Sequence, residues 1–348
     1  MKVAVLTFRW ANNYGALLQA YGLRRALESL GAEVVFPDYA PAGSRVPWWR
    51  PLGVRQGVFL QAGLMKYRCA RFRRDFLPAT RRCDSMADLS AACQDCDAVV
   101  TGSDQVWNGN GPGGFNPVYF LGFPLPAGCR RISYAACFGQ TDQPPATREG
   151  ARNLLGSLDS ISVRNNLSRE LVRQLSDRDA AVVLDPTLLH DYADLDAGPS
   201  REGGYILVYS LGTGHRALGE WIVARAKQKL GLPVVTLYPD ARFRGTDRHA
   251  LSAGPREWLR LVKGATVVIT NSFHGTTFAV GLGKRFIAWG GARPDRLEDI
   301  LRRAGALDHL ILQKDEARVD ALIGNSPVPD RLGPERKRSL SFLKGALS

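Results

Sequence analysis

The sequence predicts an α/β fold with two lobes, each built on a parallel sheet. Three observations lead to this fold class. Short runs rich in Val and Ile recur along the 348 residues and are mostly continuous, as in strands buried on both faces of a parallel sheet. Amphipathic helical patterns separate these runs, which gives βαβ units. A polar segment with Gly and Pro at 191–204 divides the runs into two series, which predicts a hinge between two Rossmann-like lobes with a cleft between them.

The expected elements follow in order along the chain. Strands of the first series are expected at 2–8, 33–39, 98–104, 131–139, 160–164 and 181–189, and strands of the second series at 205–212, 233–238, 266–271 and 285–289. The clearest helix is expected over 14–30, where five leucines and Tyr21 share one face before Gly31 ends the helix. Further helices are expected over 217–230, 255–263 and 278–282.

The two series set the expected domain boundaries. We expect an N-terminal lobe at 1–192 with a basic insert at 41–82, a linker at 193–204, a C-terminal lobe at 205–329 and a helical tail at 330–348. The chain is 45% hydrophobic and 23% charged, which is typical of a globular protein and excludes the disordered class. No apolar stretch approaches the ~20 residues of a membrane span. No apolar signal segment follows Met1, so we expect a cytoplasmic protein.

The net charge of +13 is unevenly distributed. Between Arg45 and Arg82, ten basic residues stand against the single acid Asp75, a local charge of +9. Such a segment attracts nucleic acid, anionic lipid or an anionic substrate, and solvated helix faces in an arginine-rich protein are an equally good explanation. Because no helix-turn-helix, zinc-finger or RNA-recognition motif is present, we do not expect a nucleic-acid partner.

Two motifs have the spacing of a ligand site but lack the surrounding residues or elements that such a site requires. Cys93 and Cys96 form one C-x-x-C, but no second pair completes a zinc site, so we assign no metal ligands and interpret the six cysteines as free thiols. The stretch 109–114 has the spacing G-x-G-x-x-G, yet it contains Pro112 and does not join a strand to a helix. We therefore do not predict a dinucleotide site there.

The strongest polar cluster follows the expected strand at 266–271. Asn271, Ser272 and His274 would lie at the carboxyl end of a parallel strand, where open α/β sheets bind ligands. The helix expected after them offers main-chain N–H groups to an anion. A helix cap beside a partly buried histidine is the alternative.

Polar residues also follow three other expected strands. Asp104 ends the strand at 98–104, and Arg164 comes just before two asparagines and a helix, a position that suits a phosphate or carboxylate clamp. A lone arginine at a strand end is more often a surface charge. Asn13 and Gly15 lie where the first strand leads into the first helix, and they could contact sugar hydroxyls or form an ordinary N-cap turn.

Six blocks, taken in order, resemble the polysaccharide pyruvyl transferase family. They are 13–21 (NYGALLQAY), 102–108 (GSDQVWN), 133–139 (SYAACFG), 162–164 (SVR), 185–187 (DPT) and 271–275 (NSFHG). The resemblance implies a GT-B-like pair of lobes with the active site in the interlobe cleft. It also implies phosphoenolpyruvate (PEP) as donor, a pyruvate ketal on two hydroxyls of a glycan as product, and release of phosphate.

The resemblance assigns roles to individual residues. The family's donor-site arginine and histidine correspond to Arg164 and His274, and a further basic residue corresponds to Arg296, with Arg293 as the alternative. We expect His274 to supply the proton at the donor, with phosphate binding as its alternative role, and Asp104 to orient or deprotonate an acceptor hydroxyl. The expected further donor contacts are Asn271, Ser272 and Gly275, and the expected acceptor contacts are Asn13, Gly15, Gln105 and Trp107. A buried core indole is an equally good interpretation of Trp107.

One position departs from the family pattern, because Asn165 stands where the family often has an acid. No metal or cofactor is expected, since PEP is a co-substrate. The expected partners are PEP, a glycan or diphosphate-linked sugar, and an anionic membrane surface at 45–82. Two other functions remain open: a GT-B glycosyltransferase that uses a nucleotide sugar, for which Glu298 and Asp299 are suitably placed, and a non-catalytic polyanion binder.

Overall fold

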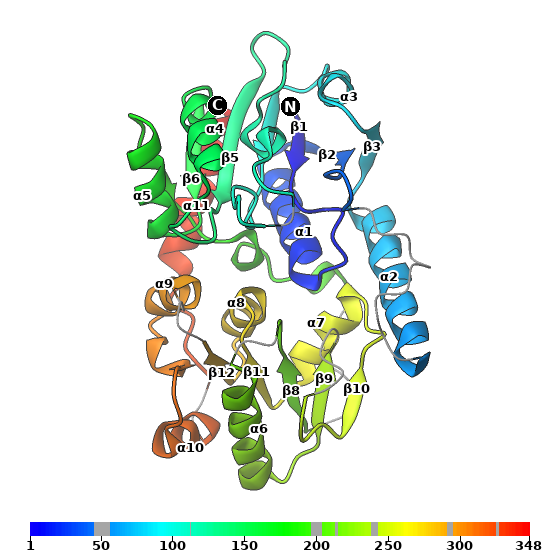
Figure 1. The fold of residues 1–348 in the computed structure, drawn as a ribbon, viewed down its shortest axis with the longest axis vertical. Helices are drawn as coiled ribbons and strands as arrows, with labels where there is room; N and C mark the ends of the chain where they lie inside the picture. Colours follow the sequence, from blue (N-terminus) through cyan, green and yellow to red (C-terminus); the bar gives the residue numbers. More distant parts are fainter. Residues whose placement is uncertain are drawn as a thin grey trace. The chain divides into compact units, whose positions relative to one another are not determined.

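The computed structural model describes residues 1–44, 56–111, 113–195, 204–212, 215–237, 243–290, 295–324 and 327–348. The chain divides into two compact units, each an α/β domain around a parallel sheet (Figure 1). The first unit consists of Met1–Pro47, Ala70–His190 and Pro334–Ser348, and the second of Trp48–Cys69 and Asp191–Gly333. The predicted fold class is confirmed.

The first unit contains a seven-stranded sheet with the order β3-β2-β1-β4-β5-β6-β7. All neighbouring strands are parallel, because βαβ crossovers connect them. The order reverses between β1 and β4, which makes their carboxyl ends a switch point where such sheets bind ligands. The strands are β1 (Lys2–Leu6), β2 (Glu33–Tyr39), β3 (Ala79–Cys83), β4 (Ala98–Thr101), β5 (Arg130–Ala136), β6 (Ser160–Val163) and β7 (Ala181–Val182).

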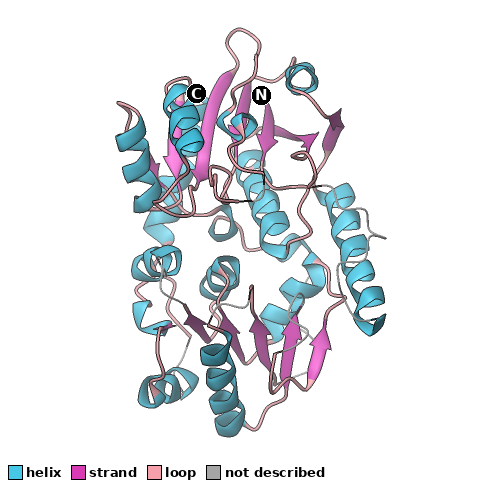
Figure 2. Ribbon diagram, viewed as in Figure 1, coloured by secondary structure: helices cyan, strands magenta, loops and turns pink. Residues whose placement is uncertain are grey.

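Helices pack around this sheet (Figure 2). They are α1 (Tyr14–Glu28), α3 (Met86–Ala92), α4 (Pro145–Leu155), α5 (Asn166–Leu175) and α11 (Gly333–Leu347), with short 3₁₀ turns η1 (Pro117–Phe120) and η2 (Pro186–Leu188). The C-terminal helix α11 returns to the first unit, where Ser339 Oγ accepts from Leu184 N at 2.9 Å. The expected tail is therefore part of the first unit's fold.

The second unit repeats the architecture with six parallel strands in the order β10-β9-β8-β11-β12-β13. Here the order reverses between β8 and β11. The strands are β8 (Ile206–Tyr209), β9 (Val234–Leu237), β10 (Arg248–Ala250), β11 (Val267–Thr270), β12 (Phe286–Trp289) and β13 (Leu310–Ile311). The helices are α6 (Arg216–Leu230), α7 (Pro255–Gly264), α8 (Phe273–Gly281), α9 (Asp295–Arg303) and α10 (Glu316–Gly324), with 3₁₀ turns η3 (Ala193–Leu195) and η4 (Leu307–His309).

The units differ from the expected lobes at the basic insert. Helix α2 (Gln56–Phe76) contributes its part up to Cys69 to the second unit and the remainder to the first. Arg68 explains this division, because its Nη1 donates to the carbonyl of Ser252 at 2.9 Å and its Nε lies 3.7 Å from Glu257. Most of the expected linker at 193–204 lies outside the described residues. Within the described part of the chain, no helix combines the length and apolar character that crossing a membrane requires.

Candidate functional site

The switch point of the second unit holds the polar cluster predicted after β11. Asn271 connects the ends of β8 and β11, because its Oδ1 accepts from Leu211 N at 2.7 Å and its Nδ2 donates to Leu211 O at 3.0 Å. Thr270 adds a second connection, donating from Oγ1 to Tyr209 O at 2.6 Å. The side chain of Asn271 thus fixes the shape of this edge, a structural role that its assignment as a donor contact did not include.

His274 lies in the first turn of α8. The helix begins at Phe273, five residues earlier than the predicted start at 278, because Ser272 caps it by accepting from Gly275 N at 3.3 Å. The imidazole is buried and its ring meets that of Phe273 edge-on, with centroids 5.4 Å apart. The alternative interpretation is therefore correct for Ser272, which is a helix cap, while the histidine beside it lies at the carboxyl edge of the sheet, the kind of edge at which open α/β sheets bind ligands.

Gly275 gives this turn its close packing. A Cβ at position 275 would lie 2.3 Å from Thr270 Oγ1 and 3.1 Å from a ring carbon of Tyr209. That threonine hydroxyl is itself held, since it also accepts from Ser272 N at 3.0 Å. A side chain at 275 would displace the hydrogen bonds that hold the β11–α8 connection together.

Sequence reasoning missed Ser210, which follows β8 at the same switch point. It is 2% exposed, and its Oγ has no hydrogen-bond partner among the described residues. Gly212 comes two residues later with φ +72°. The signal was present in the sequence, since a strand followed by Ser-x-Gly-x-Gly is the kind of turn in which main-chain N–H groups approach an anion.

Arg296 lies in the first turn of α9, which follows β12 and packs against α8. The alternative residue, Arg293, lies outside the described residues. The two acids considered for a nucleotide-sugar site also lie on α9, and Asp299 forms an ion pair with Arg303 at 3.6 Å, one turn later. The second unit thus brings His274, Ser272 and Arg296 to the carboxyl edge of one sheet.

The first unit buries Arg164 in a polar network. The side chain is 3% exposed, and its Nη1 donates to Oδ2 of Asp185 at 3.1 Å. The same carboxylate accepts from Ser103 Oγ at 2.7 Å. Its Oδ1 accepts from N and Oγ1 of Thr187, at 3.0 and 2.7 Å. Three of the blocks that carried the family resemblance therefore meet here through side chains.

Asp104 adjoins this network. Its Oδ1 lies 4.0 Å from Arg164 Nη1 and accepts from Gln105 N at 2.8 Å. Its φ of +86° is a left-handed conformation that costs a non-glycine residue about 1–3 kcal/mol and that aspartate adopts more readily than most residues. Burial alone would lower the pKa of Arg164, but Cys137, Asp185 and Asp104 raise it above its usual range, so the guanidinium stays charged.

Asn165 caps α5, which explains the departure from the family pattern. Its Oδ1 accepts from Ser168 N at 3.0 Å. Asp and Asn are comparable N-caps. The replacement therefore preserves the helix start and removes only a charge at a buried position.

Trp107 is a core residue, so its assignment as an acceptor contact is wrong. It is 1% exposed, and its indole N–H donates to Tyr119 O at 2.9 Å. Its ring is stacked on Phe120 with centroids 5.0 Å apart. Both faces of the indole therefore belong to the hydrophobic core, as the alternative reading of this tryptophan anticipated.

The other expected acceptor residues lie along the carboxyl edge of the first sheet. Asn13 caps α1 with its Oδ1, and Gly15 is buried in the first turn of that helix. Gln105 follows β4, and its Oε1 accepts from Asn108 Nδ2 at 2.8 Å. The structure therefore places Asn13, Gly15 and Gln105 at the β1–β4 switch point.

Some of the arginines in the basic segment at 41–82 form hydrogen bonds within the fold, and others are exposed to solvent. Arg68 bonds within the second unit, and Arg73 donates to the loop between β1 and α1. Arg71 and Arg74 pair with Asp75 and stay 62% and 72% exposed. Three basic residues of the segment lie outside the described part of the chain, namely Arg45, Arg50 and Arg55.

Comparisons with known proteins agree with this architecture. The family model described as Polysaccharide pyruvyl transferase matches residues 13–290. The S. aureus MnaA–UDP co-structure has a TM-score of 0.53 and 11% identity, and the match covers 99% of this chain and 90% of that chain. UDP-GlcNAc 2-epimerase from Methanocaldococcus jannaschii has a TM-score of 0.50 and 12% identity, covering 99% of this chain and 100% of that one.

At such low identity, these structures show the fold alone, two Rossmann-type domains of the GT-B-like kind. No curated protein sequence matches the chain.

Proposed function

The chain belongs to the polysaccharide pyruvyl transferase family, and from this membership we propose that it transfers pyruvate from PEP to two hydroxyls of a glycan or sugar conjugate. The product is a pyruvate ketal, and phosphate is released. The observation that carries the proposal is the family match over residues 13–290, which includes the block that contains His274. The position of His274 in the first turn of α8, at the carboxyl edge of a parallel sheet, supports it.

The donor is an anion, and the second unit offers groups suited to it. PEP carries a carboxylate and a phosphate, close to three negative charges near neutral pH. We assign donor binding to Arg296 and the start of α8, and Ser210 joins them because its buried hydroxyl lies at the same switch point. Charge-assisted hydrogen bonds of this kind contribute about 1.5–3 kcal/mol each.

The family also assigns Arg164 to the donor, and we retain that assignment as part of the proposal. Its bond to Asp185 holds the guanidinium in one position. A positioned, permanently charged guanidinium is well suited to a carboxylate or phosphate. A substitution at 164 will also affect stability, so its effect on the KM for PEP must be measured together with unfolding.

The reaction requires one proton to be added and two to be removed. A proton adds to the PEP methylene carbon, and the first acceptor hydroxyl attacks the central carbon and loses its proton. The second hydroxyl then attacks the same carbon, the C–O bond to phosphate breaks, and phosphate leaves with the bonding electron pair. We assign the donated proton to His274, a role worth ~10²–10⁴-fold in rate. Asp104 is assigned to the acceptor hydroxyl.

Release of phosphate tests this proposal directly. The protein is incubated with PEP and a panel of methyl hexosides, and in parallel with nucleotide sugars, while phosphate and nucleotide are assayed. The expected result is phosphate release that requires both PEP and a hexoside. Nucleotide release without PEP would instead establish the glycosyltransferase alternative, and tight binding of nucleic acid with a steep salt dependence and no turnover would establish the polyanion binder.

The histidine is tested with matched variants. His274→Ala and His274→Gln should both lower kcat by ~10²–10⁴-fold, and only the alanine variant removes the side chain's hydrogen-bonding capacity. His249→Ala is the control, since His249 is an exposed histidine on β10. Full velocity in either 274 variant would overturn the role of His274 as proton donor.

The exposed arginines of α2 suggest how a charged acceptor is held. We propose that Arg71 and Arg74 attract a diphosphate-linked acceptor or an anionic membrane surface that carries it. Replacing both by glutamine should raise the KM for a diphosphate-linked acceptor and leave that for a free hexoside unchanged. Equal effects on both acceptors would refute this. Arg68 is left intact because it bonds within the second unit.

A further inference from the structure

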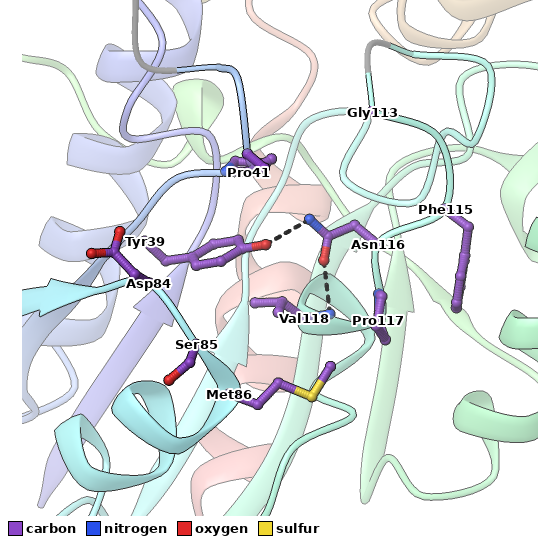
Figure 3. A pocket seen from close by; sticks show the side chains of 11 residues that line it. Tyr39, Pro41, Asp84, Ser85, Met86, Gly113, Phe115, Asn116, Pro117 and Val118 are labelled. Carbon is purple, nitrogen blue, oxygen red and sulfur yellow. Dashed lines mark hydrogen bonds between the residues drawn. The ribbon is translucent and has the colours of Figure 1, made fainter.

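The first unit contains a pocket of about 310 Å³ that none of the predicted site residues lines (Figure 3). This volume is at the lower end of the range of about 300–1,000 Å³ for small-molecule sites. The pocket lies where β2 and β3 end, which is the edge at which parallel sheets bind ligands. Its lining residues are Tyr39, Pro41, Ala42, Asp84, Ser85, Met86, Gly113, Phe115, Asn116, Pro117 and Val118.

The walls of the pocket are held by hydrogen bonds and packing. The hydroxyl of Tyr39 accepts from Asn116 Nδ2 at 2.9 Å, and Asn116 Oδ1 accepts from Val118 N at 3.0 Å. Phe115 packs on α4 at Gly150, where a Cβ would lie only 2.2 Å from the phenyl ring. The absence of a side chain at Gly150 therefore leaves room for the ring of Phe115. Gly113, in the loop with the G-x-G-x-x-G spacing, lines the same side of the pocket as Phe115 (Figure 3).

The opposite wall is equally fixed. Asp84 and Ser85 connect β3 to α3, and the main-chain N–H groups of both donate to Asp88, at 3.1 and 3.0 Å. The side chain of Asp84 is 60% exposed and its Oδ1 accepts from Arg82 Nε at 2.8 Å. A carboxylate is therefore presented at the rim, opposite the amide of Asn116.

The chemistry of the lining fits a neutral sugar better than an anion, because among the described lining residues the single carboxylate is already paired with Arg82 and no side chain is cationic. None of the described lining residues is cationic, although the whole chain carries a net charge of +13. The pocket instead combines the aromatic rings of Tyr39 and Phe115 with a carboxylate, an amide and hydroxyl groups. Such a combination packs against the C–H face of a neutral ring while its polar groups pair with hydroxyls.

We propose that this pocket binds one hexose unit of the acceptor glycan, with Tyr39 and Phe115 contacting the sugar ring and Asp84 and Asn116 bonding its hydroxyls. The proposal rests on the proposed function and adds the location of an acceptor subsite to it. The bound unit is a neutral sugar, so the subsite is distinct in its chemistry from the site for PEP.

The pocket and Asp104 lie at the same edge of the first sheet. The rings of Tyr39 and Tyr119 meet edge-on with centroids 5.9 Å apart. Asp104 follows β4 and lies at the carboxyl edge of the same sheet as the pocket. A glycan that extends from the pocket along the carboxyl edge of the sheet would therefore approach the residue assigned to the acceptor hydroxyl.

The test fills the pocket without removing a wall. Ala42→Phe introduces a ring at an exposed lining position, and Ala87→Phe is the matched control, an exposed alanine on α3 outside the lining. Tyr39→Phe and Asp84→Asn remove single polar groups. Binding of a panel of methyl hexosides is measured by saturation-transfer NMR without PEP, and the KM values for hexoside and for PEP are measured by phosphate release.

The expected result is loss of the hexoside signal and a KM for hexoside raised at least tenfold in Ala42→Phe, with the KM for PEP and the behaviour of Ala87→Phe unchanged. Hexoside binding and KM values that are the same in all pocket variants, or no hexoside signal with the wild-type chain, would overturn the subsite. The two proposals fail separately. Hexoside binding that Ala42→Phe abolishes, without any PEP-dependent turnover, preserves the subsite and refutes the transferase.

Discussion

Replacing Arg164 by alanine should destabilise the first unit, independently of any effect on turnover. The guanidinium is 3% exposed and lies 3.1 Å from the fully buried carboxylate of Asp185 and 4.0 Å from that of Asp104. Without the arginine, Asp185 keeps its hydrogen bonds from Ser103 and Thr187 but loses the guanidinium that lies 3.1 Å from its carboxylate. Removing one partner of a buried ion pair costs about 3–5 kcal/mol, because the other charge stays buried without compensation.

This magnitude is large beside the total stability of a domain. Folded domains are stable by about 5–15 kcal/mol, so a loss of about 3–5 kcal/mol in Arg164→Ala is a fifth or more of that free energy. The loss should lower the urea midpoint strongly without changing the slope of the transition much, since the folded and unfolded surfaces are nearly the same.

Urea unfolding followed by circular dichroism measures the effect. Arg169→Ala is the matched control. Arg169 forms an ion pair with Asp179 that is exposed to solvent, so its loss should shift the urea midpoint much less. The double variant Arg164→Met with Asp185→Asn should recover part of the loss, since it leaves neither charge buried alone. A change below ~1 kcal/mol in Arg164→Ala would refute the reasoning and return Arg164 to a purely ligand-binding role.

Three further outcomes follow from the structure. Gly275→Ala should destabilise the second unit by ~1–3 kcal/mol in thermal unfolding, because the added methyl displaces a held threonine hydroxyl. All six cysteines are buried, and burial raises the pKa of Cys129 to about 11, so a thiol reagent at pH 8 should label the native chain slowly and the unfolded chain at all six positions. Hydrogen bonds from Arg169 and Arg173 hold the pKa of Asp179 below its usual range, so its contribution to stability is present above the unfolded pKa and is lost as pH falls below ~4. Lowering the pH from about 5 to 2 should therefore reduce the free energy of unfolding more in the wild-type chain than in Asp179→Asn. The same dependence of unfolding free energy on pH in both chains would contradict this.

The fold could be predicted because its central strands carry an unambiguous signal. Strands such as β4 and β11 are buried at every position and read as continuous apolar runs. The edge strands β3 and β10 carry charged, exposed residues and have no such run, so they were not predicted. Edge strands are usually charged in this way because exposed ladder groups would otherwise pair with other chains.

The sequence predicted where the candidate site residues lie in the fold better than it predicted what their side chains contact. Parallel topology brings strand exits to one edge, so His274, Ser272 and Arg164 could be selected from the sequence. Their partners could not be, because the bond between Arg164 and Asp185 depends on how β6 and η2 lie in space. Trp107 shows the same limit, since only the packed structure distinguishes a core indole from one that stacks on a sugar.

The residues assigned to PEP and the residues that line the proposed hexose pocket differ in charge. The groups assigned to PEP are the guanidinium groups of Arg164 and Arg296 and the main-chain N–H groups at the start of α8, whereas the described lining of the pocket at β2 and β3 contains no cationic side chain. A trianion would lose hydration there without gaining a counter-charge from the described lining, whose carboxylate, Asp84, is paired with Arg82. A neutral hexose would keep its hydrogen bonds on entering. The lining of the proposed subsite should therefore favour a neutral hexose over the donor, even though the protein as a whole is strongly basic.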